Sequence, residues 1–284
     1  MNYLVSGSTG FIGSRLCPNL ERHGHSVIRV GRKTYPCDIP DNIDYFIHLA
    51  GLTIRKCDVG DSSAFLESNV LFTHEVLELA RGIDGLKKFI HVSTGEVYGP
   101  VLDGELHTEE KKLSPVNSYT ESKACSDQLV MGRSRQFGIP SVILRPCDVY
   151  GKGMAPKSFI PVVVNAILNG DFVRIYGDGK QKHQWLHVDD LVEAILFSCI
   201  EAPAGEVYNV PGSERCSNLE LIYMIEDALG KKGVHQYFDP PAERGPEHLW
   251  GISGRKIEKL GWRPLVSLRE GLTDFCPRHA LPLV

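Results

Sequence analysis

Near its start the chain reads Asn2-Tyr3-Leu4-Val5-Ser6-Gly7-Ser8-Thr9-Gly10-Phe11-Ile12-Gly13, an apolar run followed by three spaced glycines. The apolar run predicts a short buried strand, and residues 14–24 have the pattern of a helix. Gly7 permits a tight turn, Gly10 lets the backbone approach a phosphate, and Gly13 lets the helix pack closely on the strand. Glycines also form ordinary turns, but a strand, this turn and a helix in sequence predict a dinucleotide pyrophosphate site at the helix N-terminus.

Length and composition narrow the class of protein. The chain has 284 residues, of which 42% are hydrophobic, which suits one large domain or a main domain with a smaller lobe. A net charge of -4 gives no basic surface for nucleic acid. No apolar run reaches the roughly 18 residues of a membrane span, and no signal peptide precedes the first predicted strand. The eight cysteines form no Cys-x-x-Cys pair, so we expect reduced thiols, no metal site and a cytoplasmic protein.

Strands and helices are predicted to alternate along the first half of the chain. The strands fall at 26–30, 45–50, 88–94 and 141–145, and the helices at 61–82 and 118–137. This alternation predicts an α/β fold, a Rossmann-type doubly wound parallel sheet covered on both faces.

The composition of the sequence changes beyond Pro146: proline, glycine and charged residues become more frequent, and the predicted helices and strands become shorter. We therefore expect a dinucleotide-binding domain over 1–150 and a smaller C-terminal substrate-binding lobe over 151–284. Segments around 185–210 are expected to return to the main sheet.

The second predicted strand ends in Gly31-Arg32-Lys33. In a dinucleotide fold this end meets the adenosine ribose, where an acidic residue binds the 2′-hydroxyl of NAD and an arginine suits the 2′-phosphate of NADP. Arg32 therefore favours NADP slightly, and two solvated charges on a loop are the alternative. Asp38 and Ile39 are expected near the adenine.

Tyr119 and Lys123 are four residues apart at the start of the predicted 118–137 helix, so they face the same side. An ammonium near a phenol would lower the tyrosine pKa from about 10 and let it move a proton on or off an alcohol oxygen. Thr94 stands at the C-terminal end of a predicted strand, where ligands of such sheets bind. The three side chains are expected to converge over a nicotinamide; for the Tyr-x-x-x-Lys spacing alone, a surface helix pair is the alternative.

Further motifs extend over nearly the whole chain. They are Gly7-x-x-Gly10-x-x-Gly13, His48-Leu49-Ala50-Gly51, Asn69-Val70 with Thr73, Val92-Ser93-Thr94 with Val97-Tyr98-Gly99, Tyr119-x-x-x-Lys123, Leu144-Arg145-Pro146-x-x-Val149-Tyr150-Gly151, Tyr176-Gly177-Asp178-Gly179, His187-Val188-Asp189-Asp190 and Leu260-Gly261-Trp262-Arg263-Pro264. Jointly they resemble the extended short-chain dehydrogenases/reductases of the nucleotide-sugar epimerase/dehydratase type.

The resemblance implies bound NAD(P), a nucleotide-diphospho-sugar substrate, and commonly a homodimer through a four-helix interface. It implies Thr94, Tyr119 and Lys123 as the catalytic set, with Tyr119 as the proton acceptor. With the glycine motif, it places at the cofactor Gly7, Gly10, Phe11, Ile12, Gly13, Leu49, Ala50, Gly51, Asn69, Tyr119, Lys123 and Pro146.

Glu96 bears on the type of reaction. In hexose 4,6-dehydratases that this chain resembles, a glutamate at this place takes the proton from sugar C5, and an aspartate just before it protonates the leaving hydroxyl. Here that preceding residue is Gly95. This disfavours an ordinary dTDP-glucose 4,6-dehydratase and leaves open a related dehydratase, a decarboxylase or an epimerase acting through C5.

The nucleotide end also departs from the family pattern. Asp148 replaces the usual asparagine, and a carboxylate would repel a diphosphate unless it is paired. Lys182 and His183 stand where relatives have an arginine, so either could meet a phosphate without the bidentate fork. Arg244 fits a second phosphate-binding arginine.

The leading hypothesis is therefore an NAD(P)-dependent nucleotide-sugar epimerase/dehydratase that works through a transient 4-keto sugar, with Glu96 as candidate base. The alternative is an NADPH-dependent 4-keto-6-deoxy nucleotide-sugar reductase, which would not need that base. A non-catalytic dinucleotide-binding sensor ranks last, because Tyr119 and Lys123 are both present.

Overall fold

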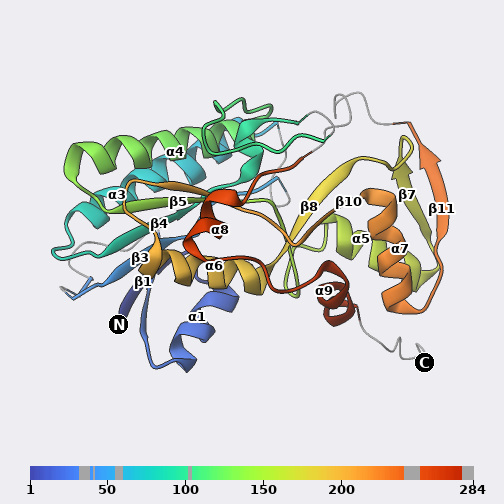
Figure 1. Ribbon diagram of the computed structural model, residues 1–284, viewed down its shortest axis with the longest axis horizontal. Helices are drawn as coiled ribbons and strands as arrows, with labels where there is room; N and C mark the ends of the chain where they lie inside the picture. Colours follow the sequence, from blue (N-terminus) through green and yellow to red (C-terminus); the bar gives the residue numbers. More distant parts are fainter. Residues whose placement is uncertain (32–38, 41, 55–59, 102–103, 240–249, 277–284) are drawn as a thin grey trace.

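The computed structural model describes residues 1–31, 39–40, 42–54, 60–101, 104–239 and 250–276. They form a larger α/β lobe and a smaller lobe beside it (Figure 1). The expected α/β class and doubly wound sheet are confirmed.

A parallel sheet is the centre of the larger lobe. Its strands lie in the order β2-β1-β3-β4-β5-β9, and every neighbouring pair is parallel. Their bounds are β1 (Asn2–Ser6), β2 (Ser26–Val30), β3 (Tyr45–His48), β4 (Lys88–Val92), β5 (Ser141–Pro146) and β9 (Val207–Val210). Every residue of β3 and β5 is buried, because helices cover both faces of the sheet.

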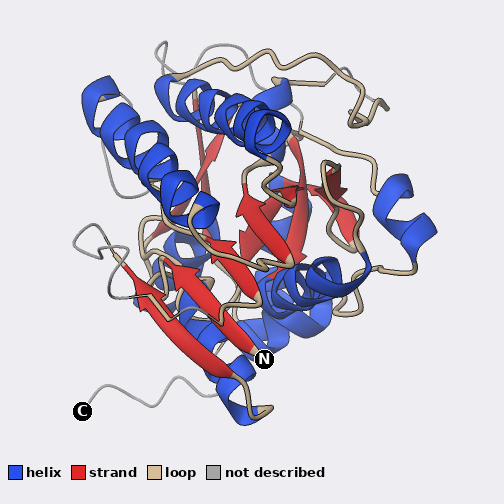
Figure 2. Ribbon diagram, turned by 90° about the vertical axis from the view of Figure 1, so that its left-hand side faces the viewer, coloured by secondary structure: helices blue, strands red, loops and turns tan. Residues whose placement is uncertain are grey.

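Each face of the sheet has its own helices, which Figure 2 shows on the two sides of the strands. One face is covered by α1 (Gly13–Arg22) and α6 (Val188–Glu201), and the other by α3 (Phe72–Arg81) and α4 (Ser118–Phe137). The helix expected over 61–82 is present in three pieces. A π-helical turn, η2 (Leu66–Leu71), separates α2 (Ser62–Phe65) from α3.

The smaller lobe has two further sheets and its own apolar core. Three strands lie in the order β10-β8-β6, and β11 pairs with β7. The elements are β6 (Asp148–Tyr150), α5 (Phe159–Asn169), β7 (Phe172–Tyr176), β8 (Lys182–His187), β10 (Glu214–Ser217), α7 (Asn218–Leu229) and β11 (Val234–Phe238).

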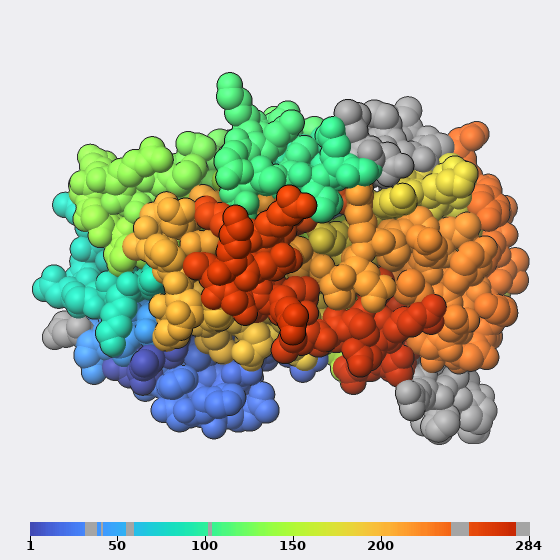
Figure 3. All heavy atoms as spheres, viewed as in Figure 1, coloured from blue at the N-terminus to red at the C-terminus, as the bar shows by residue number. Residues whose placement is uncertain are grey.

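The chain crosses between the lobes more than once. After the first small-lobe segment, α6 packs on the main sheet and β9 pairs with β5, while β8 stays in the small lobe. The C-terminal segment crosses again: α8 (Arg255–Leu260) joins the core of the larger lobe and α9 (Leu268–Phe275) that of the smaller. Figure 3 shows this red segment lying over the junction of the lobes.

No helix in the described ranges has both the length and the apolar character needed to cross a membrane. Four of the six described cysteines are buried, and all six are free thiols.

Candidate functional site

The glycine turn lies against the end of β3. Gly7 has a φ of 71°, and a Cβ on it would stand 2.6 Å from the backbone nitrogen of Ala50 and 2.8 Å from the carbonyl carbon of Leu49. Only glycine tolerates both the left-handed conformation and this close approach. The turn and the Leu49–Gly51 segment predicted at the cofactor therefore lie side by side at the carboxyl edge of the sheet.

The N-terminus of α1 fits an anion. No side chain caps it, and its first turn contains no acidic residue. A Cβ on Gly13 would stand 2.6 Å from the Cα of Ser8, so the helix start packs directly on the turn that contains Gly10. Phe11 and Ile12 complete that turn. Uncapped backbone N–H groups and the helix dipole favour a phosphate there, so these residues fit a dinucleotide.

Asn69 links the loop after β3 to α4. It lies in the π-helical turn, is buried, and its amide bonds Leu52 through both backbone groups, at 2.6 and 3.0 Å. Its Nδ2 also donates to the hydroxyl of Ser122 on α4, at 2.8 Å. The amide therefore holds the loop after β3 against the helix of Lys123, and the expected contact of Asn69 with the cofactor stays a prediction.

Thr94, Tyr119 and Lys123 come from β4 and α4, which pack together. Lys123 Nζ donates to the carbonyl of Val92, the last residue of β4, at 2.8 Å. Thr94 follows two residues later, and its Oγ1 accepts the N–H of Glu96 at 3.2 Å. Tyr119 is buried one turn before Lys123, with its ring 6.0 Å from that of Phe65. Burial lowers the pKa of the Lys123 ammonium to about 8, while Asp127 acts to raise it.

A buried polar chain behind Lys123 was not predicted from the sequence. Asp127, one turn further along α4, accepts from Arg145 Nε at 2.9 Å and faces His91 Nε2 at 3.5 Å. Arg145 also donates to the hydroxyl of Tyr98 at 2.7 Å. Burial raises the pKa of Asp127, and the neighbouring His91 ring and the charge of Arg145 lower it more strongly. The helix periodicity of the sequence places Asp127 below Lys123 and is the signal that could have found it.

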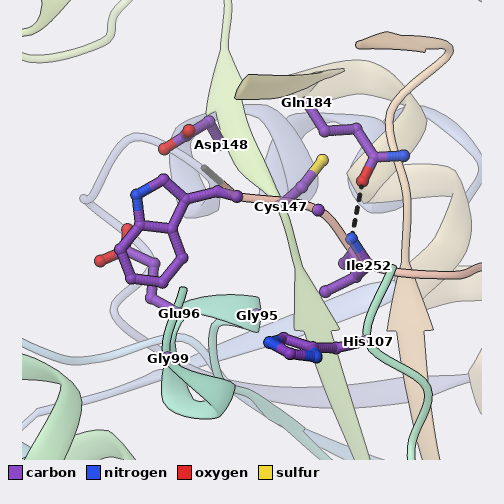
Figure 4. Close-up of a pocket in the computed structure, with 10 residues that line it drawn as sticks. Gly95, Glu96, Gly99, His107, Cys147, Asp148, Gln184 and Ile252 are labelled. Atoms are coloured by element: carbon purple, nitrogen blue, oxygen red, sulfur yellow. Dashed lines mark hydrogen bonds between the residues drawn. The ribbon is translucent and has the colours of Figure 1, made fainter. Parts of the chain in front are cut away.

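A pocket opens between the lobes just beyond β4 and β5. Its lining residues are Gly95, Glu96, Gly99, His107, Cys147, Asp148, Gln184, Trp250, Gly251 and Ile252. In Figure 4 the carboxylates of Glu96 and Asp148 lie on one side of this pocket, and the His107 ring lies on the other. Gln184 accepts the N–H of Ile252 at 3.2 Å, which holds the segment after residue 249 against β8.

The Asp148 carboxylate, which would repel a diphosphate if it were unpaired, is paired with a histidine. Its Oδ2 lies 2.8 Å from Nδ1 of His183, which stands on the adjacent parallel strand. His183 therefore faces a carboxylate of the protein through Nδ1, and its expected contact with a phosphate stays a prediction. Lys182 begins β8, and its carbonyl accepts the N–H of Trp250 at 3.1 Å.

The packing around residue 95 favours a glycine there. A Cβ on Gly95 would stand 3.0 Å from Cγ2 of Ile252 and 3.3 Å from the carbonyl oxygen of Pro146. A carboxylate at this position would have to displace the Ile252 side chain. Pro146, predicted at the cofactor, thus ends β5 directly behind the start of η3 (Gly95–Tyr98).

Some predicted site residues are not placed. Arg32, Asp38 and Arg244 lie outside the described residues. Ile39 is described and packs at the edge of the core under α3 and α4. Within the described ranges, no cluster of histidine, cysteine or acidic side chains has the arrangement of a metal site.

Known proteins share the fold of this chain and match its sequence. The Rossmann-type fold is that of solved epimerases and dehydratases, which makes the class an extended short-chain dehydrogenase/reductase. A family model matches residues 3–211, and the chain belongs to the NAD dependent epimerase/dehydratase family.

Three relatives illustrate the similarity. The dTDP-glucose 4,6-dehydratase 1 of Escherichia coli K12 is 31% identical over 96% of this chain and 91% of its own length. UDP-glucose 4-epimerase of Thermotoga maritima, solved with UDP-glucose, has a TM-score of 0.86 at 26% identity and 97% coverage of both chains. The dTDP-glucose 4,6-dehydratase of Streptomyces venezuelae, solved with NAD and TYD, has a TM-score of 0.85 at 28% identity, covering 97% and 96%.

Proposed function

We propose that this protein is an NAD(P)-dependent enzyme that epimerises or dehydrates a nucleotide-activated sugar through a transient 4-keto sugar. The main support is the position of Glu96, a carboxylate in the pocket directly after Thr94 at the end of β4. Relatives that resemble the whole chain are dehydratases and epimerases of nucleotide sugars.

When bound at the glycine turn, NAD(P) would supply the reversible hydride transfer needed at sugar C4. Tyr119 takes the proton of the 4-hydroxyl, and the Lys123 ammonium on the same helix face favours the phenolate. Because Thr94 Oγ1 accepts the N–H of Glu96, its own hydrogen is left to donate to the sugar oxygen. The resulting ketone acidifies C5–H, which Glu96 removes.

Gly95 restricts the outcome at C6. Ile252 and Pro146 fill the space of a side chain at residue 95, so the acid that would protonate a 6-hydroxyl leaving group cannot come from there. We therefore favour epimerisation through C5, or an elimination that uses another donor, over the ordinary 4,6-dehydration.

The cofactor preference, the oligomeric state and the cellular location are also proposed. We propose NADP as the slightly preferred cofactor through Arg32, which is tested by titrating the protein with NADH and NADPH. We also propose a cytoplasmic homodimer formed through a four-helix interface, whose mass light scattering after gel filtration would report.

The deciding experiment is a mass-spectrometric screen of UDP-, dTDP-, GDP- and CDP-sugars in D2O with no added cofactor. Deuterium uptake or loss of water is expected for one nucleotide. If nothing changes until NADPH and a 4-keto sugar are supplied, the reductase alternative holds instead.

Two substitutions test the proposed roles of Tyr119 as proton acceptor and Glu96 as base. Tyr119→Phe is expected to abolish turnover and to leave cofactor binding intact, because only the proton acceptor is removed. Glu96→Gln is expected to stop exchange at C5 while hydride transfer at C4 continues. If Tyr119→Phe keeps most of the activity, Tyr119 is not the proton acceptor. If Glu96→Gln leaves exchange at C5 unchanged, Glu96 is not the base.

A further inference from the structure

The described lining of the pocket offers no lysine or arginine to the substrate that we propose. Its side chains include two carboxylates, Glu96 and Asp148. His183 is bound to Asp148 at 2.8 Å. A diphosphate adds negative charge to this site, so a positively charged group close to the described lining would stabilise it, beside any contribution of the predicted Arg244.

Arg215 lies in that place. β10 pairs antiparallel with β8, and the register sets Arg215 opposite Gln184, a lining residue. Its guanidinium lies against Gly251, also a lining residue: a Cβ there would stand 3.4 Å from both Cζ and Nε of Arg215. Because Gly251 has no side chain, the guanidinium reaches the backbone that forms the pocket wall.

Two nitrogens of this guanidinium, Nε and Nη2, are buried and have no hydrogen-bond partner among the described residues. These two nitrogens form the side-on fork that binds two oxygens of one carboxylate or phosphate. Buried charged donors without acceptors are costly, so proteins seldom keep them unless a ligand satisfies them. No ion pair of Arg215 occurs among the residues that the structure describes.

We propose that Arg215 binds the diphosphate of the substrate through its Nε and Nη2 donors. The identity of the anion rests on the proposed function, whereas the unsatisfied fork beside the pocket does not. A carboxylate on the sugar is the other source of such an anion, and the test separates the two.

The test is calorimetric titration of the purified protein, with its cofactor, by UDP, dTDP, GDP and CDP. Arg215→Gln is expected to bind the preferred nucleotide about 10- to 100-fold more weakly than wild type, because a bidentate charged contact is lost. Arg174→Gln is the matched control, since Arg174 is exposed on β7, and its affinity should equal that of wild type. Arg215→Lys keeps the charge without the fork and should lose several-fold.

Equal affinity of wild type and Arg215→Gln would overturn the proposal while leaving the proposed function intact. Loss of affinity for UDP-glucuronic acid but not for UDP would assign the fork to a sugar carboxylate and also overturn it. If the glutamine variant does not fold, the lysine variant decides, and an unchanged affinity counts against Arg215. A wild type that binds no nucleoside diphosphate would reject the proposed function itself.

Discussion

Lys123 is buried at the end of β4, and burial lowers the pKa of its ammonium to about 8. The proposed chemistry needs this ammonium charged, so turnover is expected to fall as the pH rises through about 8. Asp127 raises the same pKa. Asp127→Asn should therefore move the alkaline fall in turnover to lower pH, which a pH profile of kcat measures.

Glu121→Gln is the control for that substitution, because Glu121 is exposed on the same helix. Its profile should match that of wild type. If Asp127→Asn lowers activity equally at every pH, Asp127 has a purely structural role.

Motif spacing in the sequence identified Thr94, Tyr119 and Lys123 as candidate site residues. Arg215, in contrast, could be recognised only from the pairing of β10 with β8 in the structure.

The strand, turn and helix at the N-terminus form one element whose packing depends on glycine. A Cβ on Gly13 would press on Ser8 at 2.6 Å, so Gly13→Ala should push α1 away from the turn. We expect cofactor binding at least about 10-fold weaker, a loss of roughly 1.4 kcal/mol, measured by fluorescence titration with NADH.

Gly132→Ala provides the matched control within α4. A Cβ at Gly132 meets no atom, and alanine is the better helix former, by about 1 kcal/mol. This variant should bind the cofactor normally and unfold at a slightly higher temperature. Normal cofactor binding by Gly13→Ala would show that α1 can shift without harm.

Regular elements were predictable where one periodicity runs for several turns or a full buried strand. The 118–137 helix and the 26–30 strand are confirmed at those bounds. The π-helical turn at Leu66–Leu71 was not predictable, since it fits the same apolar spacing as an α-helix. The short strands β6 and β10 exist through pairing with β8, which is distant in the sequence, so local pattern could not show them.

The stability of the whole molecule is expected to depend on two histidines in the main sheet. His48 and His91 are fully buried with rings 5.3 Å apart, and burial lowers both pKa values, that of His91 to about 4. In the unfolded chain a histidine titrates near about 6.5. Between these values the unfolded state binds more protons, so the free energy of unfolding decreases as the pH falls.

His91 contributes about 1.4 kcal/mol per pH unit within that window, His48 acts in the same direction, and the contribution of His91 is complete above pH about 6.5. Urea unfolding at several pH values between 7 and 5 measures the slope, which His91→Gln should reduce by about one proton. His23→Gln, at an exposed position, should leave the slope unchanged. A wild-type stability that is flat over this range would contradict the assignment.

The late return of β9 to the main sheet has a consequence for biosynthesis. While the ribosome is still making the small lobe, the edge of β5 is unpaired and the face that α6 will cover is open. An open edge and an apolar face are the features that let nascent chains associate wrongly. The first 150 residues thus depend on residues made more than 100 positions later, including Ile257 and Trp262 of their core, so we expect the nascent chain to be exposed to wrong association until these residues are added.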